Sequence, residues 1–458
     1  MATSSERLSE FVAQLRIERI PTPTAEHALL HTLDVLGCGI AAHAFGEAAY
    51  ALGSVREYGG HGPATAIGAD GLSPADAAFV NGTLCHALDF DDTHPTSVVH
   101  VSAGVVPAAI TAARAADATG ADLLAAIVAG NEVSVRLGTA ASGRFHARGF
   151  HPTGVCGVFG ATAAAARARG QDAVRTAHAL GIAGSMASGL LEFLADGSET
   201  KRLHPGWAAR AGLSAVALAA HGATGPATVL EGARGFFATY LHGESYDLDG
   251  QTADLGTRWV TDEIAYKPYP ACHYTHAPVD ALAHLLATTP LKADDIKSIT
   301  GFTDETGVAL VSEPAADKVH PRTPYDAKFS LPYCLATRLV TGRLDVGSFT
   351  AEAVADPEVA ALAPRIGYEL RRYDPDTFGG GVRVETVDGR VLEHELRRQR
   401  GGAENPMSPE EVLDKFRINA GYGLPPEQVE ALEHSTLGLA SLHDLTYLDA
   451  LAAATTRK

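Results

Sequence analysis

The stretch from Ala103 to about Gly222 constrains the fold most, because small residues dominate it. Apolar residues recur at helical spacing within 122–137, 157–169 and 208–220. Small side chains let helix axes approach one another closely, which favours packed helices over a sheet. We therefore predict a mainly α protein that is built on a large all-α helical domain.

Flanking segments extend this helical domain on both sides. Apolar periodicity predicts helices over 8–20 and 25–46, and Ser73 followed by Pro74 is typical of a helix start. The run 408–411, Ser-Pro-Glu-Glu, has the pattern of a capping box with proline at the first helical position. It predicts C-terminal helices that return to the same domain.

A second, smaller domain is indicated by a change of pattern after about residue 267. Segments 296–303, 365–372 and 382–387 read as strands, and the last pairs through an Asp-Gly turn with 390–396 as a hairpin. A chain of 458 residues also exceeds one ordinary core. We expect a helical domain over 1–267 and 399–458, and a smaller α+β domain over 268–398.

Composition excludes several classes of protein. The charge of 36 − 54 = −18 argues against a nucleic-acid surface. Five scattered cysteines without Cys-x-x-Cys spacing offer neither a zinc knuckle nor closely paired cluster ligands. Neither a secretory signal nor an uninterrupted apolar run of about 20 residues is visible. We expect a soluble cytoplasmic protein with reduced thiols and no membrane partner.

One polar run, His86–Ser102, stands out between the helical segments. It holds three carboxylates and three imidazoles: Asp89, Asp91, Asp92, His86, His94 and His100. Such groups are costly to bury unless they pair or take part in chemistry, so the run is a candidate active site. Taken singly, Asp89 or Asp92 could cap a helix, the residues 93–95 could form an ordinary turn, and a lone histidine is more often a core residue.

Three further segments carry candidate functional residues. His151 precedes a Gly-rich helix start, where backbone N–H groups favour a carboxylate. Lys201 and Arg202 stand in a predicted loop before a helix, where they could face a cleft or solvent. The segment 266–276 contains two prolines and reads as a strap between domains. The glycines at 379–381 lack the Lys-Ser/Thr of a phosphate loop and are read as the approach to a strand.

These segments resemble the MmgE/PrpD family. The run His-Ala-Leu-Asp-Phe-Asp-Asp-Thr from His86 is similar to the family signature, and segments 149–157, 197–210, 266–276 and 327–336 match further motifs. The resemblance implies a homodimer of helical domains with a smaller α+β lid domain, which acts on di- or tricarboxylates in a cleft. It assigns Asp89, His100, His151 and Lys201 to catalysis, and Thr93, Lys267, Cys272, His276 and Tyr333 to substrate contacts.

Histidines, aspartates and lysines suit acid–base chemistry next to a carboxylate without a cofactor. In this hypothesis His100 and His151 are base and acid in either order, Asp89 orients an imidazole, and Lys201 and Lys267 stabilise the developing negative charge. A hydro-lyase on a citrate- or 2-methylcitrate-like polycarboxylate is the favoured function.

Several alternatives stay open. The same groups suit an epimerase of a dicarboxylate such as iminodisuccinate, or a cis-aconitate-type decarboxylase. Cys272 weakens the decarboxylase reading, because it stands where those enzymes, in our alignment, carry a histidine. A metal-dependent hydrolase with Asp89, Asp91, Asp92 and His94 as ligands, and a non-catalytic binding protein, are the remaining possibilities.

Overall fold

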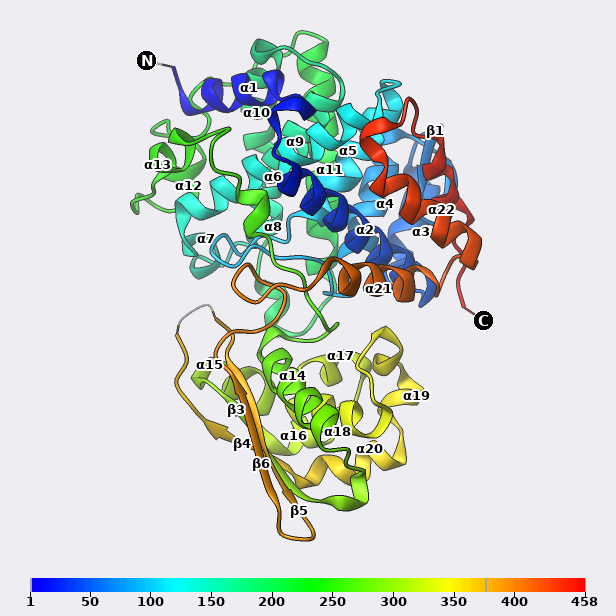
Figure 1. The fold of residues 1–458 in the computed structure, drawn as a ribbon. Coiled ribbons are helices and arrows are strands. Elements are labelled where there is room, and N and C mark those ends of the chain that lie inside the picture. Colours follow the sequence, from blue (N-terminus) through cyan, green and yellow to red (C-terminus); the bar gives the residue numbers. More distant parts are fainter. Residues whose placement is uncertain (1, 375–376, 458) are drawn as a thin grey trace. The chain divides into compact units, whose positions relative to one another are not determined.

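The computed structural model describes residues 2–374 and 377–457. The chain divides into two compact units, Met1–Tyr266 with Ser408–Lys458, and Lys267–Met407. The prediction of a mainly α chain with a smaller α+β part is confirmed (Figure 1). The boundary expected after residue 267 lies next to the one between Tyr266 and Lys267 in the structure. The chain returns to the helical unit after Met407 rather than after residue 398.

Small residues allow the central helices of the first unit to pack closely. α4 (Pro74–His86), α5 (Ser102–Ala115), α6 (Gly120–Ala141), α9 (Gly157–Ala168) and α11 (Thr200–Ala220) form its centre (Figure 1). A Cβ atom at Gly130 would lie 2.9 Å from the Ala164 Cβ and 2.9 Å from the Gly160 carbonyl oxygen. α6 is apolar and long enough to cross a membrane, but 94% of its apolar window is buried inside the structure, as in a core helix.

The remaining helices of the first unit surround this centre. They are α1 (Ser4–Gln14), α2 (Thr22–Ala44), α3 (Ala49–Tyr58), α7 (Arg144–Ala147), α8 (Pro152–Val155), α10 (Ala173–Ala183), α12 (Phe236–Tyr240), α13 (Leu248–Ala253), α21 (Pro409–Ala420) and α22 (Pro426–Leu437). The expected caps are present, because the Ser73 hydroxyl accepts from the Asp76 N–H and Ser408 forms a full capping box.

The sequence reading differs from the structure at two places in this unit. The helix expected over 8–20 begins at Ser4 and ends at Gln14, because Thr3 and Glu6 cap it in a capping box. The sequence reading also missed a small antiparallel pair, β1 (His61–Ala66) and β2 (Ala69–Leu72). Gly68 supplies the positive φ of +76° that its tight turn needs.

The second unit contains a four-stranded sheet of order β4-β3-β5-β6. Its strands are β3 (Ile296–Thr303), β4 (Ile366–Leu370), β5 (Gly380–Thr386) and β6 (Val391–Leu396). β3 and β4 run parallel, whereas β5 pairs antiparallel with both β3 and β6. The expected β5–β6 hairpin is therefore confirmed.

Helices cover this sheet and supply its core. α14 (His273–Thr288) packs on β5 and β6, and α18 (Leu331–Thr341) contacts both α14 and β4 (Figure 1). The short helices are α15 (Glu305–Gly307), α16 (Ala315–Val319), α17 (Pro324–Lys328), α19 (Ala351–Val354) and α20 (Pro357–Leu362). Gly380 lies in a strand, where a Cβ atom would come within 2.6 Å of Pro278, so close packing explains this glycine.

Candidate active site

A buried turn after α4 carries the polar run. α4 ends at His86, the Asp89 N–H donates to the His86 carbonyl oxygen at 3.0 Å, and Asp89 itself adopts a positive φ of +54°. Thr93 exchanges two backbone hydrogen bonds of 2.9 Å with Ala265, and the His94 N–H donates to the Val99 carbonyl oxygen at 2.9 Å. These bonds fix the backbone of a segment that has no helix or strand of its own before α5.

The buried carboxylate of Asp91 joins two imidazoles. Its Oδ2 lies 2.8 Å from His86 Nδ1 and 3.2 Å from His100 Nδ1. The side chains of Asp91 and His86 are 0% exposed and that of His100 is 9% exposed. A carboxylate beside both Nδ1 atoms favours the tautomer that has its proton there, and this leaves the Nε2 lone pairs of both rings for other partners.

Electrostatics keeps Asp91 charged and His86 neutral. Burial works against ionisation of Asp91, but the neighbouring imidazoles of His86 and His100 outweigh it and hold the pKa of Asp91 well below its usual range. Burial lowers the pKa of His86 to about 4, against the opposing effect of Asp91. Asp91 is therefore a fixed anion that accepts a hydrogen bond from the neutral ring of His86.

His100 occupies the junction of the cluster. Its backbone N–H donates to the Thr153 hydroxyl at 3.0 Å, and its Nδ1 also lies 3.2 Å from the Thr93 hydroxyl. Its Nε2 lies 3.8 Å from Asp89 Oδ1. The ring is thus held at one nitrogen and faces the Asp89 carboxylate with the other.

Lys201 supplies the cation of the cluster. Its Nζ donates to Asp89 Oδ1 at 2.8 Å, and the two side chains are 20% and 19% exposed. The expected loop position was wrong, because α11 begins at Thr200 and Lys201 therefore lies in its first turn. The neighbouring Arg202 pairs with Glu47 at 2.6 Å and Glu199 at 2.7 Å, away from Asp89.

His151 and His204 form a second imidazole pair. His151 is the residue before α8, as its position ahead of a Gly-rich helix start suggested, and its Nδ1 lies 2.9 Å from His204 Nδ1. Burial and the nearby His86 and Lys201 hold the pKa of His151 well below its usual range, and burial lowers the pKa of His204 to about 4. Both rings are therefore neutral near pH 7.

A deeper layer of polar groups, which the sequence reading did not identify, supports the turn. Asp92 lies 2.8 Å from His31 Nδ1 and accepts from the Ser102 N–H at 3.0 Å. The Lys415 Nζ lies 2.7 Å from Asp34 and donates to the Phe90 carbonyl oxygen at 2.8 Å. The signal that could have found these groups is an ionisable residue on the buried face of a helix: His31 and Asp34 in α2, and Lys415 in α21.

The four-residue metal set considered from the sequence does not converge. Asp92 faces His31 and Ser102, and His94 lies 3.1 Å from the Ser97 hydroxyl and 3.6 Å from Glu263. The ligand-type side chains that do come together are two other groups, His86 with His100 and His151, and Asp89 with Asp91 and His100. Within the described residues, Asp89 and Asp91 thus come together with His100 rather than with Asp92 and His94.

The other candidate residues lie in the second unit, which we describe by itself. Lys267 is buried, and Cys272 precedes α14 with its N–H bonded to the Lys328 carbonyl oxygen at 2.9 Å. His276 Nε2 lies 3.0 Å from the Ala271 carbonyl oxygen, and the Tyr333 hydroxyl donates to the Ser348 carbonyl oxygen at 2.5 Å. Burial raises the pKa of Tyr333 to about 12. Substrate contacts by these four residues stay a prediction.

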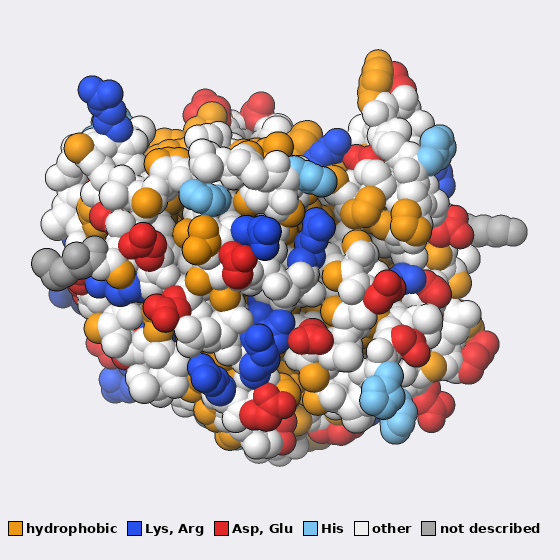
Figure 2. All heavy atoms as spheres, turned by 90° about the horizontal axis from the view of Figure 1, so that it is seen from above, with side chains coloured by type: hydrophobic (Ala, Val, Ile, Leu, Met, Phe, Trp, Pro, Cys, Tyr) orange, Lys and Arg blue, Asp and Glu red, His pale blue; other side chains and the backbone are white. Residues whose placement is uncertain are grey.

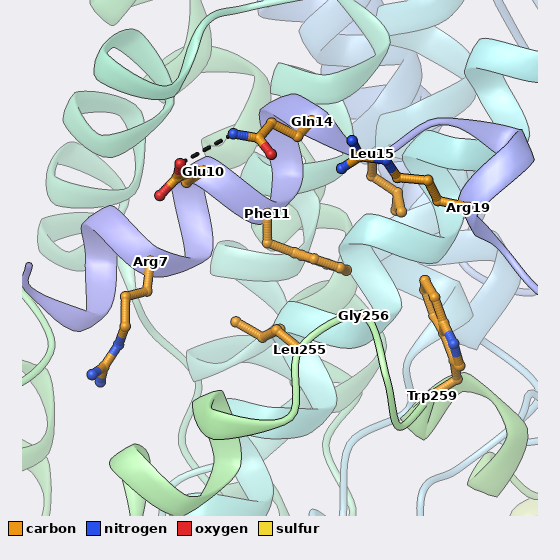
Figure 3. A pocket seen from close by; sticks show the side chains of 9 residues that line it. All are labelled: Arg7, Glu10, Phe11, Gln14, Leu15, Arg19, Leu255, Gly256 and Trp259. Carbon is orange, nitrogen blue, oxygen red and sulfur yellow. Dashed lines mark hydrogen bonds between the residues drawn. The ribbon is translucent and has the colours of Figure 1, made fainter.

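The first unit also has a cavity of about 390 Å³ beside α1, apart from the histidine cluster. Figure 3 shows Phe11 and Trp259 among its lining residues, with ring centroids 6.2 Å apart. Two of its polar groups are paired with neighbours: Gln14 donates to Glu10 at 3.1 Å, and Arg7 donates to Asp249 at 2.6 Å. Acidic and basic side chains are also interspersed on the face of the molecule that Figure 2 shows. The histidine cluster therefore remains the stronger candidate active site.

Comparison with known proteins gives two family models and several relatives. The model described as MmgE/PrpD N-terminal domain matches residues 6–249, and the model described as MmgE/PrpD C-terminal domain matches residues 269–439. The cis-aconitate decarboxylases of Mus musculus and Homo sapiens are each 32% identical over 83% of this chain, and the match covers 78% and 79% of their lengths. The 2-methylcitrate dehydratase of Cupriavidus necator is 27% identical over 94% of this chain and 92% of its own length.

Proposed function

The chain belongs to the MmgE/PrpD family, and from this premise we propose that it is a lyase that acts on a tricarboxylate by proton transfer at a carbon next to a carboxylate. The observation that carries the proposal is the arrangement at His100. One ring nitrogen lies 3.2 Å from the buried Asp91 carboxylate, and the other lies 3.8 Å from the Asp89 carboxylate that Lys201 holds.

His100 is the proposed base. With its proton at Nδ1, beside Asp91, its Nε2 lone pair can take a proton from substrate carbon. The imidazolium that results gains stabilisation from Asp91, as in other carboxylate–imidazole pairs. Which of the two histidines acts as base was open from the sequence, and the position of Asp91 favours His100. Asp91 also takes the orienting role that the sequence reading gave to Asp89.

Lys201 is the proposed electrostatic partner of the intermediate. Loss of the carbon-bound proton moves an electron pair onto the adjacent carboxylate, and a fixed cation stabilises this charge. Lys201 is 20% exposed in the described structure, so a substrate carboxylate can reach its ammonium group beside Asp89. His151, which burial keeps neutral, would donate a hydrogen bond to the leaving oxygen.

Dehydration completes the proposed cycle. The electron pair returns from the carboxylate to form the alkene, the C–O bond breaks, and the hydroxyl takes the proton from His100 and leaves as water. This step needs no redox partner. The relatives named 2-methylcitrate dehydratase support this version.

Decarboxylation is the second candidate, and the 32% identity to the cis-aconitate decarboxylases favours it. There the C–C bond to a carboxylate breaks, carbon dioxide leaves, and the carbanion takes a proton that His100 Nε2 has accepted from solvent. The same cluster would serve both reactions, so the substrate decides between them.

Proton NMR in D₂O with EDTA-treated protein separates these reactions. The panel is citrate, 2-methylcitrate, cis-aconitate and iminodisuccinate. Alkene formation or hydration identifies a hydro-lyase, loss of cis-aconitate with release of carbon dioxide identifies a decarboxylase, and deuterium incorporation without an alkene identifies an epimerase. No change in any of the four compounds would contradict the proposal.

A further inference from the structure

Three imidazoles from separate segments converge in the first unit. His86 ends α4, His100 lies just before α5, and His151 lies just before α8. One ring nitrogen of each lies within 4.8 Å of the others, and all three residues are buried. Their ring centroids are 4.6, 5.7 and 6.2 Å apart.

The buried nitrogen of His86 that faces away from Asp91 has no assigned task. His86 Nδ1 lies 2.8 Å from Asp91, whereas its Nε2 has no hydrogen-bond partner among the described residues. Its side chain is 0% exposed, so bulk water does not satisfy this nitrogen. Buried polar atoms normally have a partner, and this lone pair beside two other imidazoles is free to act as a ligand atom.

The surroundings have the features of a metal site. Asp91 lies beside the Nδ1 atoms of both His86 and His100, which directs their Nε2 lone pairs away from it. Carboxylates that hold metal-binding histidines in this way orient the ring and raise its basicity. The His204 ring lies in the corresponding place beside His151 Nδ1.

We propose that His86, His100 and His151 bind a divalent transition-metal ion of the Zn²⁺ class, and that this ion inhibits the enzyme. Three imidazoles suit Zn²⁺, Co²⁺ or Ni²⁺ rather than Mg²⁺ or Ca²⁺, which prefer oxygen ligands. Zinc–nitrogen distances of about 2.0–2.1 Å place tetrahedral ligand nitrogens about 3.4 Å apart. In the structure the three ring nitrogens lie within 4.8 Å of one another, so the rings would move slightly closer together when they bind the ion.

Inhibition follows from the identity of the ligands. Because His100 Nδ1 lies beside Asp91, the ion binds the ring through Nε2. Nε2 is also the atom through which His100 acts as the proposed base, so the metal and the proton compete for it. This part of the inference rests on the proposed function. Metal binding itself does not, because it can be measured without substrate.

The binding test uses the full chain after EDTA treatment and desalting. Titration calorimetry with Zn²⁺ alone should show one ion per chain, and Co²⁺ should give the visible absorption of a tetrahedral complex. X-ray absorption of the zinc-loaded protein should count three imidazole nitrogens and no sulfur. Absence of stoichiometric binding, or a sulfur ligand, would overturn the site without bearing on the proposed reaction.

Variants identify the ligands. His86→Gln should weaken Zn²⁺ binding by at least about 100-fold, and Asp91→Asn by about 10–100-fold. His94→Gln is the matched control, because His94 is a buried histidine of the same run that lies 3.1 Å from Ser97, and this variant should bind Zn²⁺ like wild type. Wild-type affinity in a folded His86→Gln protein would also overturn the site. If His86→Gln does not fold, His151→Gln and the absorption measurement decide.

Inhibition is then tested on the substrate that the NMR panel identifies. Added Zn²⁺ should abolish turnover, and EDTA should restore it. Binding without inhibition would overturn the inhibitory role, and an inactive protein that binds zinc at three imidazoles would show that only the proposed function has failed.

Discussion

Asp91 Oδ2 lies 3.2 Å from His100 Nδ1 inside the first unit, and the Asp91 side chain is 0% exposed. This carboxylate is separated from the imidazole by eight residues in sequence, and the turn at Asp89 brings the two together. Because the same carboxylate also holds His86, it sets the orientation and the tautomer of two rings at once.

Asp91→Asn should lower kcat by about 10²–10⁴-fold, because an amide can donate to Nδ1 and stabilise the wrong tautomer of His100. KM should change much less, since Asp91 is fully buried and does not meet substrate. Steady-state kinetics checks this split. Asp70→Asn, at an exposed position of β2, is the control and should behave like wild type. A rise in KM with unchanged kcat would contradict the positioning role.

Lys201→Ala should lower kcat/KM by about 10²–10³-fold, as expected when a fixed charge that stabilises an intermediate is removed. The neighbouring Arg202 offers a matched control, because it carries the same charge but pairs with Glu47 and Glu199. Arg202→Ala should retain most of the activity. Equal losses in the two variants would show that Lys201 has no special role.

Lys415→Met should destabilise the protein by about 3–5 kcal/mol at pH 8, because it leaves the buried Asp34 carboxylate without its cation. Burial already raises the pKa of Asp34 to about 6, despite the opposing effect of Lys415. A raised carboxyl pKa contributes stability below the unfolded value near 4, and this contribution is lost as pH rises through the folded value.

The loss in Lys415→Met should therefore be smaller at pH 5 than at pH 8, because protonation of Asp34 limits the cost. Urea unfolding at the two pH values measures the difference. Arg417→Met, in the same helix α21, loses ion pairs with the exposed Glu410 and Asp414 and with the partly buried Glu433, and should cost only about 1 kcal/mol. A pH-independent loss in Lys415→Met would contradict the buried ion pair.

Gly130→Ala should destabilise the helical unit by about 1–3 kcal/mol, because the added Cβ would lie 2.6 Å from Val105 Cγ1 and 2.9 Å from the Ala164 Cβ. Gly53→Ala, in α3 with open space around the new Cβ, should instead be neutral or stabilise by up to about 1 kcal/mol. Thermal or urea unfolding of both variants provides the comparison.

Periodicity predicted the helical unit well, since small residues such as Gly130 and Gly160 recur where helices touch. Alternating strands and an Asp-Gly turn likewise predicted the β5–β6 hairpin. The β1–β2 pair was missed because its short strands carry Gly and Pro and only two buried residues, Ala66 and Leu72, so no apolar alternation marks it.

Residues near one another in the polar run could be assigned to one site from sequence. The role of Asp91 could not be predicted from sequence, because Asp89, Asp91 and Asp92 are three aspartates within four positions. Only the backbone conformation decides which carboxylate lies beside His100 Nδ1. The supporting layer of His31, Asp34 and Lys415 was also out of reach, since these residues are distant in sequence and lie on helices that read as ordinary core.

The central claim, that His100 moves a proton at the carbon next to a substrate carboxylate, is tested most directly by deuterium. Wild-type protein and His100→Gln are each incubated in D₂O with the compound that the NMR panel identifies. The measurement is the rate of turnover of this compound, or the rate at which it incorporates deuterium. The account predicts carbon-bound exchange or turnover in D₂O for wild type and a loss of at least about 10²-fold in the variant, the typical contribution of a general base. Exchange at the wild-type rate in a folded His100→Gln protein would contradict it.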